Sequence, residues 1–245
     1  MTRIGIIGAG GRMGRAIAAL LEGGTAAGAK LAGGAGRGDD PVELAQGSDV
    51  LIDFSTPGAL EASLAAASGA SVPIVVGTTG LGPDHHRLID QAAARTAVLQ
   101  SANMSLGVNL IAHLVREAAA RLGPEWDIEV VEMHHRHKAD APSGTALLLG
   151  TAAAQGRGVD LATVSDRGRD GMTGPRKEGD IGFAVLRGGS VAGDHEVVFA
   201  GEGERIAIGH RAESRAIFAQ GALKAALWIA GRPAGRYSMN DVLGL

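Results

Sequence analysis

Apolar residues in the first hundred positions form short blocks separated by glycine and polar turns. Four blocks are rich in Ile, Val and Leu and are predicted buried strands: 3–7, 50–54, 72–76 and 97–100. Three other stretches have apolar residues at helical spacing: 16–21, 59–67 and 83–94. Strands that alternate with helices over such lengths form a parallel sheet, so this half of the chain is predicted to be a series of β-α units.

The pattern changes after residue 105. Apolar residues recur at helical spacing over 106–122, and strict alternation over 126–133 predicts a half-buried strand. A second helix is predicted over 143–154, with Ser143 as its N-cap. The stretch 155–180 has little periodicity and is expected to be a long loop around a short strand near 162–165.

Three further strands are predicted near the end of the chain, at 181–187, 194–200 and 204–210. Short glycine turns at 188–189 and 201–203 connect them, too short for helical crossovers, so antiparallel pairs are expected. A helix at 218–229 and a short tail at 239–245 follow.

These elements predict an α/β protein of two domains. Residues 1–105 plus 214–245 are expected to form a Rossmann-type parallel-sheet domain that binds a dinucleotide. Residues 106–213 are expected to form an inserted α+β domain of mixed sheet, for substrate binding and oligomerisation; its length suits a domain. An open sheet with a small core often covers its other face with a partner subunit, so a homo-oligomer is predicted.

Composition narrows the class of protein. The chain has no cysteine, which excludes disulfides and thiolate metal sites. A net charge of -3 and 3% aromatic residues argue against a nucleic-acid or anionic membrane partner. No apolar stretch approaches the ~18 residues of a membrane span, so a cytoplasmic protein without membrane contact is expected.

A glycine-rich segment at 8–14 joins the first strand to the first helix, the context that the dinucleotide fingerprint requires. Counted from Gly8, the third glycine of G-x-G-x-x-G would fall on Met13, whereas Gly8, Gly11 and Gly14 fit G-x-x-G-x-x-G. The helix start would present its N–H groups to a pyrophosphate. A glycine turn without a ligand remains the alternative.

A second strand is expected at about residues 30–35, between the blocks at 3–7 and 50–54, and the residues at its end set the choice of nicotinamide cofactor. An acidic residue there normally binds the ribose 2′-hydroxyl of NADH, but no carboxylate occurs before Asp39. Arg37 stands where a guanidinium could meet a 2′-phosphate. We therefore predict that NADPH binds at least as well as NADH. The alternative is that Asp39 or Asp40 folds back onto the ribose.

A cluster of histidines and cations follows the strand at 126–133. Its members are His134, His135, Arg136, His137 and Lys138. Shortly afterwards Ser143, Gly144 and Thr145 open a helix, whose free N–H groups can bind an anion. Proton donors beside an anion site suit a negatively charged substrate that must receive a proton.

A metal ion is not predicted in this cluster. Adjacent histidines could ligate one, but Arg136 and Lys138 would repel a cation, and no carboxylate or cysteine stands at ligand spacing. The remaining histidines are expected to be surface or structural residues and receive no role: His85, His86, His113, His195 and His210.

Three segments together resemble one known family. Residues 8–14, 77–80 and 132–146 are similar to those of the 4-hydroxy-tetrahydrodipicolinate reductase (dihydrodipicolinate reductase) family of bacterial lysine and diaminopimelate synthesis, and the last segment is highly specific to it. The resemblance covers the full length. It implies an NAD(P)H-dependent reductase, a homotetramer, acting on a cyclic dicarboxylate made from pyruvate and aspartate semialdehyde.

The resemblance also implies residue roles. His134 matches the family's proton donor and Lys138 its second proton donor, while His135, Gly144 and Thr145 match contacts to the substrate carboxylates. The implied cofactor contacts are Gly8, Ala9, Gly10, Gly11, Arg12, Met13, Gly77, Thr78, Thr79, Ser101, Ala102, Asn103 and Met104. The family often has an acidic and then a basic residue after the second strand; here these positions look like Gly36 and Arg37, a departure that favours NADPH.

Two other functions stay open at this point. Another small-acid dehydrogenase could share the two-domain plan, but it would not explain residues 134–138 followed by 142–145. A nucleotide-sensing protein would keep the glycine turn and would not need a proton donor.

Overall fold

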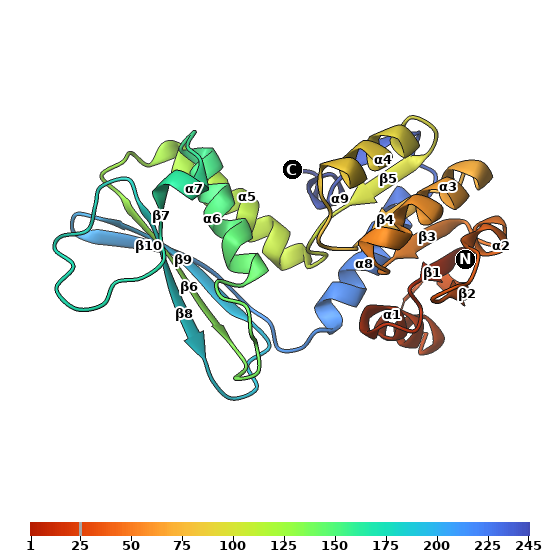
Figure 1. Cartoon of the computed structure of the whole chain (residues 1–245), viewed down its shortest axis with the longest axis horizontal. Coiled ribbons are helices and arrows are strands. Elements are labelled where there is room, and N and C mark those ends of the chain that lie inside the picture. Colours follow the sequence, from red (N-terminus) through yellow and green to blue (C-terminus); the bar gives the residue numbers. More distant parts are fainter. Residues whose placement is uncertain (25) are drawn as a thin grey trace. The chain divides into compact units, whose positions relative to one another are not determined.

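The computed structural model describes residues 1–24 and 26–245. The chain forms two compact units, residues 1–106 with 216–245 and residues 107–215, and each is described by itself (Figure 1). Among the described residues, no helix combines the length and the apolar character needed to cross a membrane.

The first unit is built on a six-stranded sheet in the order β11-β5-β4-β3-β1-β2. Every pairing in it is parallel. Its strands are β1 (Thr2–Ile7), β2 (Ala29–Ala35), β3 (Val50–Asp53), β4 (Ile74–Val76), β5 (Ala97–Gln100) and β11 (Gly235–Tyr237). The predicted Rossmann-type sheet is therefore confirmed.

Helices cover both faces of this sheet (Figure 1). On one face lie α1 (Arg12–Glu22) and α8 (Ala216–Ile229), which pack against side chains such as Ile4 and Ile52. On the other lie α2 (Pro41–Gln46), α3 (Leu60–Ala70), preceded by the 3₁₀ turn η1 (Pro57–Ala59), and α4 (Pro83–Ala93). Because both faces are buried, the strands are almost wholly apolar, as the sequence indicated.

The end of the chain differs from the expected tail. Residues 235–237 form the edge strand β11, and the helix α9 (Met239–Leu243) follows. Ser238 caps this helix by accepting a hydrogen bond from the Asn240 amide at 3.2 Å. Elements of three and five residues are too short to show a period in the sequence.

The second unit contains a five-stranded sheet in the order β10-β9-β6-β8-β7. Its strands are β6 (Asp127–His134), β7 (Ser165–Asp166), β8 (Ile181–Arg187), β9 (Asp194–Gly201) and β10 (Glu204–Arg211). Its helices are α5 (Leu106–Arg121), α6 (Gly144–Gly156) and α7 (Leu161–Val164). The central strand β6 pairs parallel with β8 and antiparallel with β9, so the sheet is mixed, as predicted.

Two local predictions for this unit are wrong. The turn at Gly188 and Gly189 does not join a hairpin, because β8 and β9 lie on opposite sides of β6. The strand expected near 162–165 is mostly the helix α7, whose start Asp160 caps by accepting from the Ala162 amide at 3.0 Å; the strand β7 holds only two residues. The hairpin between β9 and β10 is confirmed.

Only one face of the second sheet is covered by α5 and α6 (Figure 1). Its core includes Val130, Phe199 and Leu149, all completely buried. Alternation along β6 continues this inner face from Val130 to Glu132 and His134, which are also buried. Polar side chains therefore end an otherwise apolar row.

Candidate active site

The glycine turn after β1 requires glycine at its first and last positions. Gly8 has φ +81° and donates its amide to the Ala35 carbonyl at 2.8 Å. Gly11 is the N-cap of α1 and donates to the Gly8 carbonyl at 2.9 Å. A Cβ on Gly14 would lie 2.6 Å from Ala9 Cα. The turn is thus packed tightly against the start of α1. Because its glycines have no side chains, a ligand can approach the backbone of the turn closely.

A cavity of about 490 Å³ lies where β1, β2 and β3 end. Gly8, Gly10 and Gly11 line it together with Arg37 and Asp39. In open parallel sheets, nucleotides bind beyond the carboxyl ends of the strands. The glycine cradle, the helix start and the Arg37 guanidinium fit the phosphates of a dinucleotide.

Asp39 folds back to the end of β2. Its carboxylate accepts a hydrogen bond from the Gly36 amide at 2.8 Å. The cavity therefore has an anion and the cation Arg37 on the same loop. This is the arrangement considered above as the alternative to a purely cationic site.

The other predicted cofactor residues lie at neighbouring strand ends. Gly77 donates its amide to the Asp53 carbonyl at 2.8 Å, and Ser101 donates to the Val76 carbonyl at 3.1 Å. The Thr78 hydroxyl is buried and donates to Asp53 Oδ1 at 3.0 Å. The lining of the cavity includes none of Gly77–Thr79 or Ser101–Met104, nor Ala9, Arg12 or Met13. Their part in cofactor binding stays a prediction.

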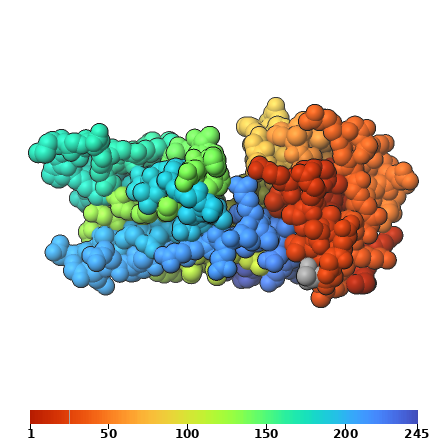
Figure 2. Space-filling model, turned by 90° about the horizontal axis from the view of Figure 1, so that it is seen from below, coloured from red at the N-terminus to blue at the C-terminus, as the bar shows by residue number. Residues whose placement is uncertain are grey.

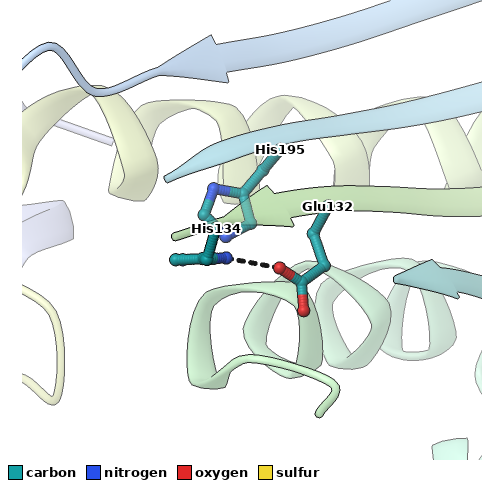
Figure 3. Close-up of side chains that lie close together, drawn as sticks. All are labelled: Glu132, His134 and His195. Carbon is teal, nitrogen blue, oxygen red and sulfur yellow. Dashed lines mark hydrogen bonds and ion pairs between the residues drawn. The ribbon is translucent and has the colours of Figure 1, made fainter. Parts of the chain in front are cut away.

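The buried polar cluster of the second unit consists of Glu132, His134 and His195 (Figure 3). Glu132 and His134 share one face of β6, and His195 lies opposite Glu132 on the neighbouring strand β9. His134 Nδ1 is hydrogen-bonded to Glu132 Oε2. The rings of His134 and His195 meet edge to face, with centroids 5.0 Å apart.

Glu132 is held as a carboxylate. Burial raises the pKa of Glu132, but hydrogen bonds from Arg187, His134 and the Ser143 amide outweigh it, and the net shift is downward. Arg187 supplies two of these bonds, each 3.0 Å long, and Ser143 N donates at 3.0 Å. A carboxylate only accepts, so His134 Nδ1 carries a hydrogen and Nε2 is its remaining ring nitrogen.

His195 is the residue that the sequence prediction missed, since it was given no role. It is 5% exposed, and its Nε2 lies 3.1 Å from Ser143 Oγ. Burial and then the adjacent His134 lower the pKa of His195 to about 4, so its ring is neutral at neutral pH. Alternation over 194–200 could have placed it on the inner face with Val197 and Phe199. That it lies opposite Glu132 follows only from the register between β6 and β9, which the sequence does not show.

The other members of the cluster lie in the turn after β6. The strand ends at His134, and the rings of His135 and His137 in the following turn have centroids 6.3 Å apart. Lys138 Nζ contacts both carboxylate oxygens of Asp140 at 2.9 Å. Partial desolvation, and then the positive charge of Arg215, lower the pKa of His135.

The start of α6 is built as predicted. Ser143 is the N-cap and accepts the Ala146 amide at 3.1 Å. Gly144 follows and is exposed, and a Cβ placed on it would have no neighbour within 4 Å. The first residue of the helix is therefore open to solvent, one position after the Ser143 amide that Glu132 holds, and a helix N-terminus is a place where a carboxylate can bind.

The geometry corrects the argument about a metal ion. A carboxylate does stand at ligand distance, because donor atoms of Glu132, His134 and His195 lie within 4.8 Å of one another. Both oxygens of Glu132, however, already accept hydrogen bonds from the Arg187 guanidinium. A divalent cation at this point would face that positive charge, so the donor set does not fit a metal site.

Comparison with known proteins covers the whole chain. Residues 2–104 match the family model "Dihydrodipicolinate reductase, N-terminus", and residues 107–243 match "Dihydrodipicolinate reductase, C-terminus". The 4-hydroxy-tetrahydrodipicolinate reductase of Zymomonas mobilis is 60% identical, over 99% of this chain and 97% of that protein. The corresponding protein of Caulobacter vibrioides is 52% identical over 99% and 97%.

Among solved structures, the dipicolinate-bound dihydrodipicolinate reductase of Paenisporosarcina sp. TG-14 is similar, with a TM-score of 0.77. The match covers 97% of each chain at 20% sequence identity. At that identity the likeness establishes the fold.

Proposed function

The chain belongs to the dihydrodipicolinate reductase family, and we propose how its own residues carry out the family's reaction. It is an NAD(P)H-dependent oxidoreductase that converts 4-hydroxy-tetrahydrodipicolinate to tetrahydrodipicolinate in lysine and diaminopimelate synthesis. In the net reaction the hydroxyl group and one ring hydrogen leave together as water, and one hydride and one proton enter the ring. The nicotinamide supplies the hydride.

The proton comes from His134 in our proposal. The observation that carries it is the position of this residue at the end of β6, with Nδ1 bonded to Glu132 and Nε2 left for a substrate. Histidine is the side chain best suited to proton transfer near neutral pH. Lys138 is proposed as a second proton donor; a substrate would have to compete with Asp140 for its ammonium group.

The two carboxylates of the substrate are proposed to bind near the start of α6. Gly144 and Thr145 supply amides of the helix N-terminus, and Gly144 is open to solvent. His135 lies beside the positive charge of Arg215, which favours an anion at that point. An uncharged ring analogue is expected to lose most of this binding energy.

The direct test is an assay of NADPH oxidation that depends on the freshly generated product of dihydrodipicolinate synthase. We expect oxidation only when pyruvate, aspartate semialdehyde and the synthase are all present. A chain that binds NADPH but never oxidises it under these conditions would be a nucleotide sensor. Oxidation with other small acids instead would indicate a different dehydrogenase.

We propose that NADPH binds at least as well as NADH. Arg37 lines the cavity and carries the charge that a 2′-phosphate needs. Asp39 on the same loop supplies a carboxylate for the ribose hydroxyl groups of NADH, so both cofactors are expected to be used. A strong preference for NADH in the Michaelis constants would contradict this proposal.

We also propose that the protein is a cytoplasmic homotetramer joined through residues 106–213, with 1–105 and 214–245 binding the dinucleotide. The sheet face opposite α5 and α6 supports the assembly. Val131, Met133, Leu186 and Arg211 line a cavity of about 380 Å³ there, and Leu186 is 51% exposed. Figure 2 shows the β9–β10 hairpin, in blue, at the surface of this unit. Sedimentation that shows only monomer at micromolar concentration would refute a tetramer.

A further inference from the structure

Glu132 is an unusual residue for the interior of a sheet. It is 1% exposed and continues the apolar row of Ile128 and Val130 on β6. A charged carboxylate in such a place is costly unless hydrogen bonds compensate it. The core cluster of this unit is built of apolar side chains such as Val130 and Phe199.

The contacts of Glu132 show what the charge does. Its Oε1 accepts from the Ser143 amide and from Arg187, and its Oε2 accepts from His134 and from the other nitrogen of Arg187. Arg187 also donates to the Asp140 carbonyl at 2.8 Å, in the loop between β6 and α6. One carboxylate, directly and through Arg187, thus connects the proposed proton donor, the loop and the N-cap of the helix α6.

We propose that Glu132 is a positioning residue, which fixes the ring of His134 with Nε2 toward the substrate and sets it against the start of α6. This inference rests on the proposed role of His134. Arg187 balances the charge of the carboxylate and holds it in place. His195 completes the arrangement, because it contacts the His134 ring edge to face and bonds to Ser143.

The structure explains why a carboxylate is needed at this point. An amide could still accept from the Ser143 N–H, but it could not accept from both Arg187 and His134 on its second group. His134 would then lose the partner that fixes the hydrogen on Nδ1. Loss of an orienting carboxylate beside a catalytic histidine lowers turnover without removing the histidine.

The test is a double-mutant cycle between Glu132→Gln and His134→Gln, with kcat and KM measured for each variant. We expect Glu132→Gln alone to lower kcat roughly 10²-fold and to change KM by less than about threefold. In the His134→Gln background the same change should lower kcat by less than about threefold, because the residues act as a unit. If the loss of kcat in the double variant equals the product of the losses in the two single variants, the residues act independently. The proposal would then be overturned in favour of a structural role for Glu132.

Two further variants keep the test decisive. Glu129→Gln is the matched control, because Glu129 lies on the same strand and pairs with Arg169 and Arg176 away from the cluster. It should leave kcat unchanged. Glu132→Asp keeps the negative charge that Arg187 balances. Its side chain is one methylene shorter, so the carboxylate lies farther from His134. If Glu132→Gln does not fold, Glu132→Asp should still lower kcat about tenfold, and a wild-type kcat would overturn the proposal.

The outcomes separate this inference from the function on which it rests. Wild-type turnover in His134→Gln would remove His134 from the mechanism, whatever the behaviour of Glu132. A large loss in His134→Gln with full activity in Glu132→Gln would leave the function intact and refute only the positioning role.

Discussion

The two units build their binding sites from different materials. In the first unit the turn after β1 contributes backbone alone to the cavity at the strand ends, because Gly8, Gly10 and Gly11 have no side chain. In the second unit the cluster around Glu132 is made of side chains that neutralise and orient one another. The comparison shows that one site is vulnerable to added atoms, and the other to the removal of a single functional group.

The largest effect is expected from removing the proposed proton donor, His134, from the side-chain cluster. His134→Gln should lower kcat roughly 10²–10³-fold, because a lost general acid costs that much at the chemical step. The dissociation constant of NADPH, measured by fluorescence titration, should stay unchanged. If His134→Gln also binds NADPH more weakly, the two sites are not independent of each other.

A second expected effect concerns the stability of the buried cluster. His195 has a pKa of about 4 in the folded chain, against about 6.5 when unfolded, so the unfolded chain binds more protons between these values. Stability should therefore fall as pH falls from about 6.5 to about 4, by about 2 kcal/mol at pH 5. Urea unfolding at pH 7 and pH 5 measures the loss.

The His195 contribution can be isolated by substitution. His195→Gln should flatten this part of the pH dependence, whereas the control His137→Gln, at an exposed position, should keep the wild-type slope. An equal slope in wild type and His195→Gln would show that another group is responsible.

A somewhat smaller effect is expected from adding one carbon to the backbone site. Gly14→Ala places a Cβ against Ala9, and overpacking of this kind costs about 1–3 kcal/mol. The dissociation constant of NADPH should rise roughly tenfold as the turn shifts. Gly69→Ala is the control, because Gly69 lies on α3 outside the cavity lining and a Cβ there would have no neighbour within 4 Å. Equal effects at both positions would contradict a packing requirement.

The smallest effect is expected in the loop after β2, where Arg37 and Asp39 both line the cavity. Asp39→Asn keeps an acceptor for the Gly36 amide and removes the negative charge beside Arg37. The Asp39 carboxylate would repel the 2′-phosphate of NADPH, which NADH lacks. Removing a repulsion of about 1 kcal/mol should raise the affinity for NADPH, relative to that for NADH, about fivefold. Asp40→Asn is the control, since Asp40 caps α2. If Asp39→Asn changes the affinities for NADPH and NADH equally, Asp39 only stabilises the loop and does not influence the choice of cofactor.

The sequence predicted the elements of both units better than their arrangement. Periodicity located β1, β6 and the start of α6 closely, because burial of one face or of both leaves a pattern in the chain. Strand order leaves no such pattern. The glycine turn between β8 and β9 is typical of a hairpin, yet β6 lies between these strands.

The same limit applies to the candidate site. His134 could be predicted because it ends a strand and stands among other proton carriers. His195 could not, since it comes next to Glu132 only through the register between β6 and β9, and the two are distant in the chain. Glu132 itself was part of a recognised segment, but only its burial and its bonds to Arg187 distinguish it from a surface carboxylate.

The central position of β6 has a consequence for how the two sites move. A strand hydrogen-bonded on both sides opens only with the global unfolding of its unit, so its amides exchange slowly with solvent. His134 is attached to that strand, whereas the loop carrying Arg37 and Asp39 is exposed and can open locally. Opening around His134 is therefore expected to be slow and opening of the Arg37–Asp39 loop fast, so the two proposed sites should move on different timescales.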